Sequence, residues 1–270
     1  MTGDGIEDIA IGAPNASGNG LSSSGRVGIW SGLSNEGTLT DADFVIDGFY
    51  EGGWMGNRLQ DAGDQNGDGY NDFLVGYDEG EIVQILPGGL NSPDPSSDYI
   101  SRVVEEGDID QTDSYMVGDV DGDGVRDLGV IFESHTVKIF TSLNGNPTYS
   151  ENTTTPSLTI DGTKSWLFSL LDLGDLDGDG LSDTLVGANR YEAAGTAEAV
   201  VAFGSDLENA AETQFADYSL RARSERIRAQ FGYRTAMIDD MDGDGIPEIL
   251  FGGSGDNKNT GAVATIPVPQ

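Results

Sequence analysis

The stretch Asp175-Leu-Asp-Gly-Asp-Gly-Leu-Ser-Asp183 decides how this chain can fold, because the sequence repeats it. Acidic residues stand at positions 1, 3, 5 and 9 of the stretch, and glycine stands at position 6. Asp4-Gly-Ile-Glu-Asp8 has the spacing of the second half of another copy. Three further copies are nearly complete: Asp64–Asp72 with Asn66 at position 3, Asp119–Asp127, and Asp240–Glu248, which ends on glutamate.

The spacing suits a calcium ion, which takes six to eight oxygen ligands at about 2.3–2.6 Å. Side chains at positions 1, 3 and 5 of a tight loop can converge on one ion. Position 7 can add its backbone carbonyl, position 9 can add a carboxylate, and glycine at position 6 permits the positive φ of a sharp turn. The predicted ligands are Asp64, Asn66, Asp68, Tyr70 and Asp72; Asp119, Asp121, Asp123, Val125 and Asp127; Asp175, Asp177, Asp179, Leu181 and Asp183; and Asp240, Asp242, Asp244, Ile246 and Glu248.

The residues after each loop favour strands. Asp72-Phe-Leu-Val-Gly, Asp183-Thr-Leu-Val-Gly and Glu248-Ile-Leu-Phe-Gly are short apolar runs of the β type. An EF-hand loop begins alike but places its bidentate glutamate at position 12 between two helices. The alternative is a set of acidic surface turns without metal, but four nearly complete copies favour about four Ca²⁺ sites in strand–loop–strand hairpins.

The loops recur at a regular interval. The position-5 aspartates Asp4, Asp68, Asp123, Asp179 and Asp244 are 64, 55, 56 and 65 residues apart, which is typical of a propeller or another repeat array. Each repeat carries strand-like segments in the same order, with turn residues between them. We therefore predict an all-β fold; only Glu208–Phe215 could form one or two helical turns. The predicted repeats are residues 1–48, 49–103, 104–161, 162–222 and 223–270.

Two short motifs accompany the loops and give the chain a family resemblance. Phe231-Gly232 and, in softened form, Met55-Gly56 precede the acidic stretch, and Gly12-Ala13-Pro14 follows it. With these motifs the chain resembles the FG-GAP repeats of the integrin alpha-subunit β-propeller and its prokaryotic relatives. Repeat three departs most, because Ile131-Phe-Glu133 replaces GAP and no FG precedes Asp119. The resemblance implies blades of four antiparallel strands, with calcium between the first and second strands.

We expect residues 1–270 to form a single propeller domain within a longer chain. Repeat one begins inside its calcium loop, and repeat five ends after its third strand at Pro267–Gln270. One upstream segment could supply the two absent strands; alternatively, whole blades precede the chain, or another chain supplies the strands. Unpaired edges attract other strands, so the chain could self-associate through them.

Composition excludes several classes of function. The net charge of −34 with 13 basic residues argues against nucleic acid, whose phosphates need lysine and arginine. No apolar run of 18 residues exists, which predicts no membrane span. The sequence has no cysteine, so calcium would take the place of disulfides as a staple. The acidity suits a saline habitat or a solubilised secreted protein equally.

We find no catalytic constellation. His135 is the only histidine, and its place at a strand end is typical of a surface residue. Most close carboxylate pairs lie in the acidic loops. Arg221, Arg223, Arg226, Arg228 and Arg234 could dock an acidic partner or glycan, but pairing with neighbouring carboxylates is the simpler interpretation. Tyr50, Trp54 and Trp166 could line a sugar-binding rim or pack between blades.

These observations predict a non-enzymatic, calcium-binding recognition or adhesion module, or a surface-assembly module, at the cell surface or outside the cell. Millimolar calcium there fills sites with dissociation constants of about 10⁻⁴–10⁻³ M. The ligand would be a protein or polysaccharide. The alternatives are a non-catalytic accessory domain of a secreted carbohydrate- or lipid-active enzyme, and a building block of a surface layer.

Overall fold

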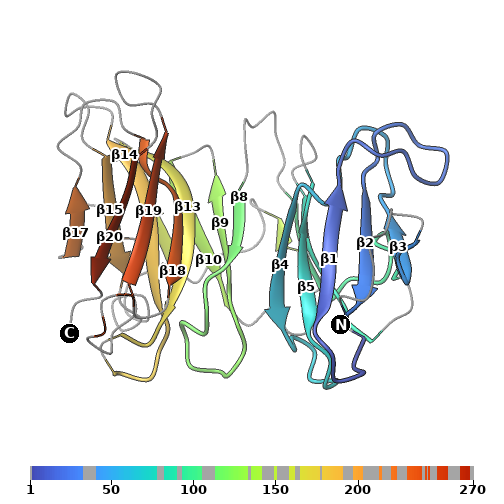
Figure 1. Ribbon diagram of the computed structural model, residues 1–270, viewed down its shortest axis with the longest axis horizontal. Helices are drawn as coiled ribbons and strands as arrows, with labels where there is room; N and C mark the ends of the chain where they lie inside the picture. The colour runs from blue at the N-terminus through green and yellow to red at the C-terminus, as the bar shows by residue number, and fades with distance from the viewer. Residues whose placement is uncertain are drawn as a thin grey trace. The chain divides into compact units, whose positions relative to one another are not determined.

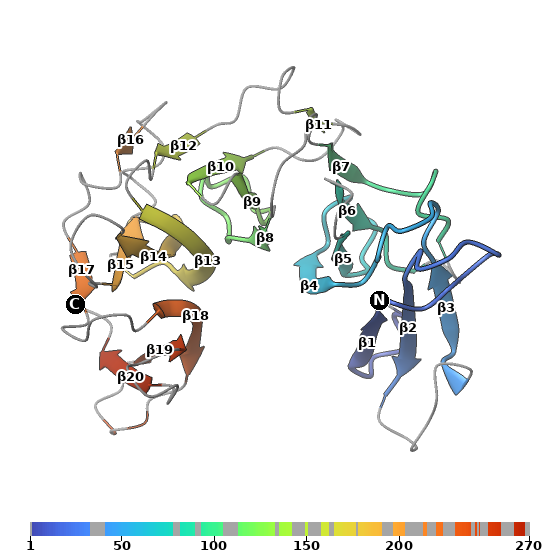
Figure 2. The same ribbon diagram turned by 90° about the horizontal axis from the view of Figure 1, so that it is seen from above.

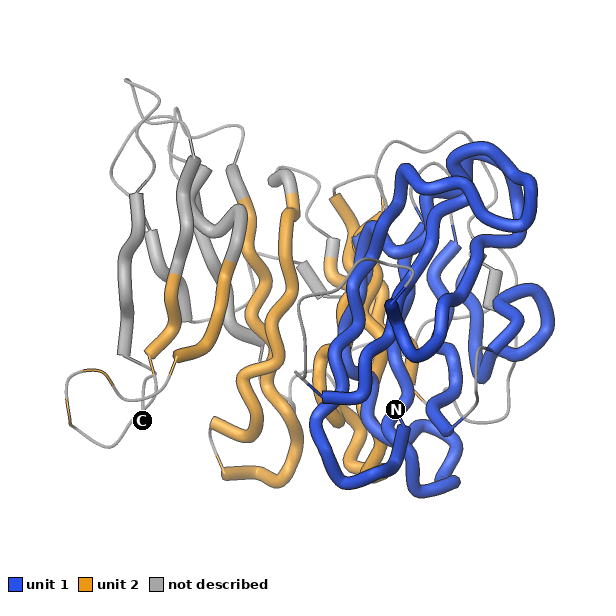
Figure 3. The backbone as a smooth tube through the Cα atoms, turned by 45° about the vertical axis from the view of Figure 1, so that its right-hand side comes forward, with its two compact units in different colours: residues 1–114, 142–155 blue, residues 115–141, 156–270 orange. Residues whose placement is uncertain are grey.

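The structure is a computed structural model of the whole chain. It describes residues 2–32, 41–77, 82–89, 93–104, 113–132, 135–141, 149–150, 158–161, 165–176, 178–190, 197–202, 213–214, 220–223, 230–238, 241, 243, 248–254 and 262–267. The chain divides into two compact units, coloured separately in Figure 3. Unit 1 holds residues 1–114 and 142–155, and unit 2 holds residues 115–141 and 156–270. The prediction of a single domain stays a prediction.

The described secondary structure consists of strands, labelled in Figures 1 and 2. The first sheet of unit 1 has the order β1-β2-β3, with β1 at Asp8–Ala13, β2 at Arg26–Ser31 and β3 at Phe44–Asp47. Its second sheet has the order β11-β7-β6-β5-β4, with β4 at Arg58–Gly63, β5 at Asp72–Gly76, β6 at Ile82–Leu86, β7 at Ser101–Val104 and β11 at Tyr149–Ser150.

Unit 2 contains three sheets, apart from the first two residues of β8. One has the order β16-β12-β10-β9-β8, with β8 at Asp113–Met116, β9 at Leu128–Phe132, β10 at Thr136–Phe140, β12 at Leu158–Asp161 and β16 at Thr213–Gln214. The next has the order β13-β14-β15-β17, with β13 at Ser165–Gly174, β14 at Asp183–Arg190, β15 at Ala197–Ala202 and β17 at Leu220–Arg223. The last has the order β18-β19-β20, at Gln230–Ile238, Glu248–Ser254 and Ala262–Pro267.

Each repeat folds as an antiparallel meander. In repeats two, three and four, four strands pair in sequence order, and repeats one and five show three such strands among the described residues. The all-β prediction and the antiparallel order within repeats are confirmed. These four-stranded meanders fit the blades of a β-propeller.

Two short edge strands were not predicted from the sequence. β11 pairs in parallel with β7, and β16 pairs in parallel with β12. In each case the segment between the third and fourth strands of one repeat covers the outer edge of the preceding sheet. The helical prediction for Glu208–Phe215 is therefore wrong at Thr213–Gln214, where pairing with Ile160–Asp161 gives the backbone its hydrogen bonds. Residues 208–212 and 215 lie outside the described residues.

The core lies between adjacent sheets. The strand after the acidic loop is buried along its whole length in β5 and β9, so these segments read as continuous apolar runs. In unit 1, Phe73 and Val75 of β5 pack with Val27 and Ile29 of β2. In unit 2, one cluster joins residues of the β8–β12 sheet to residues of β13 and β14: Val117, Val120, Ile131, Val137, Ile139, Leu158, Ile160, Leu167, Leu170, Val186 and Ala188.

Two motif glycines let neighbouring sheets of unit 1 approach. Gly56, of the softened FG motif, has φ of 88° and donates its amide to the carbonyl of Gly76. A Cβ on Gly12, of the GAP motif, would lie 1.9 Å from the carbonyl oxygen of Gly56. Because only glycine avoids this clash, the FG glycine of one repeat and the GAP glycine of the preceding repeat form a backbone-to-backbone contact.

Candidate metal-binding loops

The acidic stretches connect the first and second strands of their sheets. We name them loop two (Asp64–Asp72), loop three (Asp119–Asp127), loop four (Asp175–Asp183) and loop five (Asp240–Glu248), and we call Asp4–Asp8 loop one. Loop two leads from β4 into β5, loop three from β8 into β9, and loop four from β13 into β14. Position 9 begins β5 and β14, and it immediately precedes β9.

Position 1 organises the backbone of each described loop. The carboxylate of Asp119 accepts the amides of Asp123 at 3.1 Å and Gly124 at 2.9 Å. The same bonds to positions 5 and 6 recur from Asp64 in loop two and from Asp175 in loop four. The glycines at position 6 have positive φ, such as 88° at Gly124, which only glycine adopts readily. The aspartate at position 1 and the glycine at position 6 therefore together form the backbone turn of the loop.

Position 9 is the buried end of each loop. Asp72 and Asp183 are 0 % exposed, and Asp127 is 1 % exposed. One oxygen of each position-9 carboxylate accepts the amide of position 2, at 2.7–2.8 Å, in loops two, three, four and five. This bond ties the start of each loop to the strand at its end.

Loop three brings its carboxylates together. Oxygen atoms of Asp119, Asp121 and Asp127 lie within 4.8 Å of one another, and no other group of three acidic side chains in the described part of the chain does so. Burial, followed by the negative charges of Asp121, Asp123 and Asp119, raises the pKa of Asp127 to about 8, although the Val120 amide opposes the shift. Like charges gathered at a buried carboxylate favour a cation that neutralises them.

Loop two has the same spacing but a different arrangement. The side-chain amide of Asn66 donates to Asp68 at 2.9 Å, and Asn66 in turn accepts the amide of Asp68. Both oxygens of Asp72 accept backbone amides, from Gln65 and Gly88. Burial also raises the pKa of Asp72. Hydrogen bonds within the protein thus satisfy oxygens of loop two that a metal would otherwise contact.

Loops four and five are described in part. In loop four, Asp175, Asp179 and Asp183 take the same places as their counterparts in loop three, and Asp177 lies outside the described residues. In loop five, Glu248 is 4 % exposed, and among the described residues its Oε1 atom has no hydrogen-bond partner. A buried carboxylate oxygen without a partner is costly and suits a cation ligand. Asp240, Asp242, Asp244 and Ile246 lie outside the described residues.

Position 7 was expected to contribute only its backbone carbonyl as a ligand, but its amide and its side chain also make contacts. The amides of Tyr70, Val125 and Leu181 each donate to the position-5 carboxylate of their own loop. A Cβ on Gly122, at position 4 of loop three, would meet the Leu181 side chain at 3.0 Å. In unit 1, a Cβ on Gly3 would likewise collide with Tyr70. In these two pairs the position-7 side chain therefore lies over the position-4 glycine of the preceding repeat.

The other sequence candidates are described only in part. His135 is partly exposed in the turn between β9 and β10. Tyr50 stacks on Tyr77 with ring centroids 5.5 Å apart, so it packs between sheets. Trp54 is partly buried and has φ of 47°. Six further side chains lie outside the described part of the chain: those of Trp166, Arg221, Arg223, Arg226, Arg228 and Arg234.

Comparison with known proteins identifies the repeats. Residues 119–186 match the FG-GAP-like repeat family. The chain is 32% identical over 180 residues to integrin alpha-PS2 of Drosophila melanogaster. That alignment covers 58% of this chain and 13% of the integrin, so the chain corresponds to a small part of that protein.

A solved structure of a BBS1N–ARL6DN complex contains a chain with a TM-score of 0.42 and 12% identity. The match covers 78% of this chain and 54% of that one, and at this similarity it adds nothing to the argument. None of the described segments forms a helix with the length and apolar character that a bilayer crossing requires. The acidic loops, the motif glycines and the sequence matches agree: the chain carries FG-GAP-like repeats similar to those of an integrin alpha subunit.

Proposed function

We propose that this chain forms blades of a calcium-stabilised β-propeller that recognises a protein or polysaccharide outside the cell. The observation that carries the proposal is the convergence of Asp119, Asp121 and Asp127 around the buried start of β9. The repetition of the same loop in the other sheets extends it to about four sites.

The donor sets fit calcium in chemistry. All the side-chain donors at the proposed ligand positions are oxygens, as Ca²⁺ requires; Met241 is the one sulfur in the loop sequences, and it stands at position 2, outside the proposed ligand set. The residues that would hold the ions are positions 1, 3, 5, 7 and 9 of loops two, three, four and five. Calcium would supply positive charge to crowded carboxylates and would fix each hairpin between the first two strands of its sheet.

A role outside the cell follows from the expected affinity. The loops are short, the position-5 side chains of loops two, three and four are exposed, and loop two is partly satisfied by its own hydrogen bonds. Such sites suit the 10⁻⁴–10⁻³ M dissociation constants of extracellular modules. The similarity to an integrin alpha subunit supports the same location, and adhesion is the function that this similarity favours.

A cleft in unit 1 supports recognition. It has a volume of about 680 Å³ and is lined by Ile6, Glu7, Asp61 and Tyr70, among others. Ile6 is 61 % exposed, so an apolar side chain stands beside carboxylates at the surface. This chemistry suits a ligand with both cationic and apolar groups. The alternative function is a non-catalytic accessory domain of a secreted enzyme, in which the propeller would bind the substrate polymer.

Calorimetric titration with calcium tests the proposal. We expect binding of about four ions per chain at millimolar calcium. The variant Asp119→Asn should lose one of these, because it removes the charge at position 1 and keeps an oxygen that can accept the loop amides. Binding to immobilised candidate proteins and polysaccharides should then depend on calcium. A chain that takes up no calcium at millimolar concentration would overturn the proposal.

A further inference from the structure

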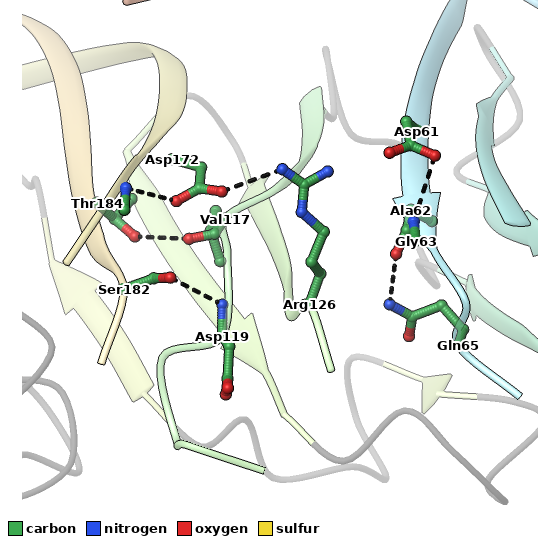
Figure 4. A network of polar contacts seen from close by, with 11 residues as sticks. Asp61, Ala62, Gly63, Gln65, Val117, Asp119, Arg126, Asp172, Ser182 and Thr184 are labelled. Carbon is green, nitrogen blue, oxygen red and sulfur yellow. Dashed lines mark hydrogen bonds and ion pairs between the residues drawn. The ribbon is translucent and has the colours of Figure 1, made fainter. Parts of the chain in front are cut away.

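We propose that loops three and four bind calcium with positive cooperativity, because one set of contacts fixes the ligand residues of both. This inference rests on the proposed calcium function and adds a regulation to it. Both loops belong to unit 2, and their contacts are drawn in Figure 4.

A pair of hydrogen bonds joins the two loops directly. The amide of Ser182 donates to the carbonyl oxygen of Asp119 at 2.7 Å. The amide of Asp119 donates to the Ser182 hydroxyl at 3.2 Å. Asp119 is the position-1 ligand of loop three, and Ser182 stands between Leu181 and Asp183, positions 7 and 9 of loop four. A ligand residue of one loop is therefore bonded to the ligand-bearing segment of the other.

An ion pair joins the same loops from the other side. Arg126, at position 8 of loop three, pairs with Asp172 at 3.2 Å. The second oxygen of Asp172 accepts the amide of Gly174, the residue before position 1 of loop four. Arg126 neighbours Asp127, so the end of loop three is linked to the start of loop four (Figure 4).

The space between the loops leaves little freedom. A Cβ on Gly118, which precedes Asp119, would lie 2.5 Å from atoms of both Asp172 and Ser182. Thr184 also donates its hydroxyl to the carbonyl of Val117 at 3.3 Å. Val117 and Thr184 are both buried, so this bond stands in the core beneath the loops. The two hairpins therefore cannot rearrange independently without breaking shared contacts.

These contacts would couple calcium binding in loop three to calcium binding in loop four. Calcium in loop four would order Leu181 and Asp183, and so hold Ser182 in the position that aligns Asp119. Part of the ordering cost of loop three would then already be met, which raises its affinity without any change of shape. Linkage requires the reverse effect to be equal. Neutralising one acidic loop also lowers repulsion on the other, but salt screens that part and leaves the mechanical part.

Calcium titration followed by NMR resolves the two sites. The amides of Gly124 and Gly180 each donate to the position-1 carboxylate of their own loop, so each reports on one site. The variant Asp179→Asn should disable loop four and lower the calcium affinity of loop three by about fivefold or more, the usual range of coupling between sites. The loss should persist at high salt.

The matched variants Ser182→Ala and Ser182→Thr test the contact itself. Ser182→Ala removes the hydroxyl and leaves every proposed ligand residue in place, and it should make both titration curves shallower and reduce the effect of Asp179→Asn on loop three, because the Asp119 amide loses its acceptor on loop four. Ser182→Thr keeps the hydroxyl and should keep the coupling. If Asp179→Asn does not fold, the contrast between the two Ser182 variants decides the question alone.

Three negative results are distinguishable. If neither glycine signal responds to calcium, the proposed function fails. If both respond, but loop three binds equally well with loop four disabled, cooperativity is refuted while calcium binding stands. If the alanine and threonine variants titrate alike, coupling through the Ser182 hydroxyl is refuted.

Discussion

Loops two and three have nearly the same sequence pattern and different chemistry. In loop three, three carboxylates meet within 4.8 Å and the pKa of Asp127 is raised to about 8. In loop two, Asn66 replaces the acid at position 3 and donates to Asp68, while both oxygens of Asp72 accept backbone amides. Loop three gathers three carboxylates, whereas hydrogen bonds within loop two satisfy part of its polar side chains.

Acidic spacing alone therefore does not fix how the carboxylates of a loop are satisfied. The bonds from position 1 to the amides of positions 5 and 6 are the same in both loops, so the backbone turn needs no metal to explain it. What changes is the charge within the turn. We therefore expect loop three to depend on calcium more strongly than loop two.

The largest expected effect is that of chelation. Four sites at about tenfold saturation, which millimolar calcium gives for a dissociation constant of about 10⁻⁴ M, would each add about 1.4 kcal/mol to the free energy of unfolding, so removing calcium should lower the melting temperature by more than about 10 °C. Hydrogen exchange should distinguish loop three from loop two: on chelation, the exchange rate of the Gly124 amide should rise more than that of the Gly69 amide. Excess calcium should restore both. An unchanged melting curve in chelator would count against calcium as a folding ligand.

Matched substitutions at position 1 come next. Asp119→Ala removes a metal ligand and the acceptor of several loop amides, and in millimolar calcium it should lower the free energy of unfolding by about 3 kcal/mol or more. Asp64→Ala removes the same group from loop two and should cost less, because that loop gains less from calcium. Urea unfolding of both variants measures the difference. Equal losses, or a larger loss for Asp64→Ala, would break the proposed ranking.

The pH dependence of the metal-free protein should be smaller but of definite sign. The pKa of Asp127 is raised from 3.8 to about 8 by burial and by neighbouring carboxylates, so the folded state holds a proton that the unfolded state releases. The folded state is favoured by this group below pH 4, and that advantage is lost as the pH rises toward 8. In chelator, Asp127→Asn should flatten the fall in stability over this window more than Asp72→Asn does. Identical slopes for the two variants would contradict it.

The smallest effect should come from making loop two resemble loop three. Asn66→Asp supplies a fourth carboxylate and removes the amide that donates to Asp68. We expect the calcium affinity of loop two to rise several-fold, since affinity follows ligand charge. In chelator the same variant should be slightly less stable than the parent chain, because the new charge repels its neighbours. Titration followed at the Gly69 amide measures the affinity, and an unchanged or lower value would show that position 3 is not a ligand.

Local sequence patterns predicted most of the fold. The runs after the loops become β5, β14 and β19. The spacing within the loops and the repeat length can be predicted from a single sequence, because they follow from residues close together in the chain. Contacts between repeats do not: the parallel edge strand at Thr213–Gln214 and the bond from Ser182 to Asp119 join residues more than 50 positions apart. Nothing local distinguishes Ser182 from any other polar residue in a turn.

We propose that these loops hold calcium. A crystal structure of the protein grown in millimolar calcium tests it most directly. We expect an ion contacted by oxygens of Asp119, Asp121, Asp123 and Asp127, with the Val125 carbonyl as a further ligand, at about 2.3–2.6 Å. Anomalous scattering can identify that ion as calcium. A well-ordered loop three in which those carboxylates contact only water and backbone amides, with no ion between them, would contradict the claim.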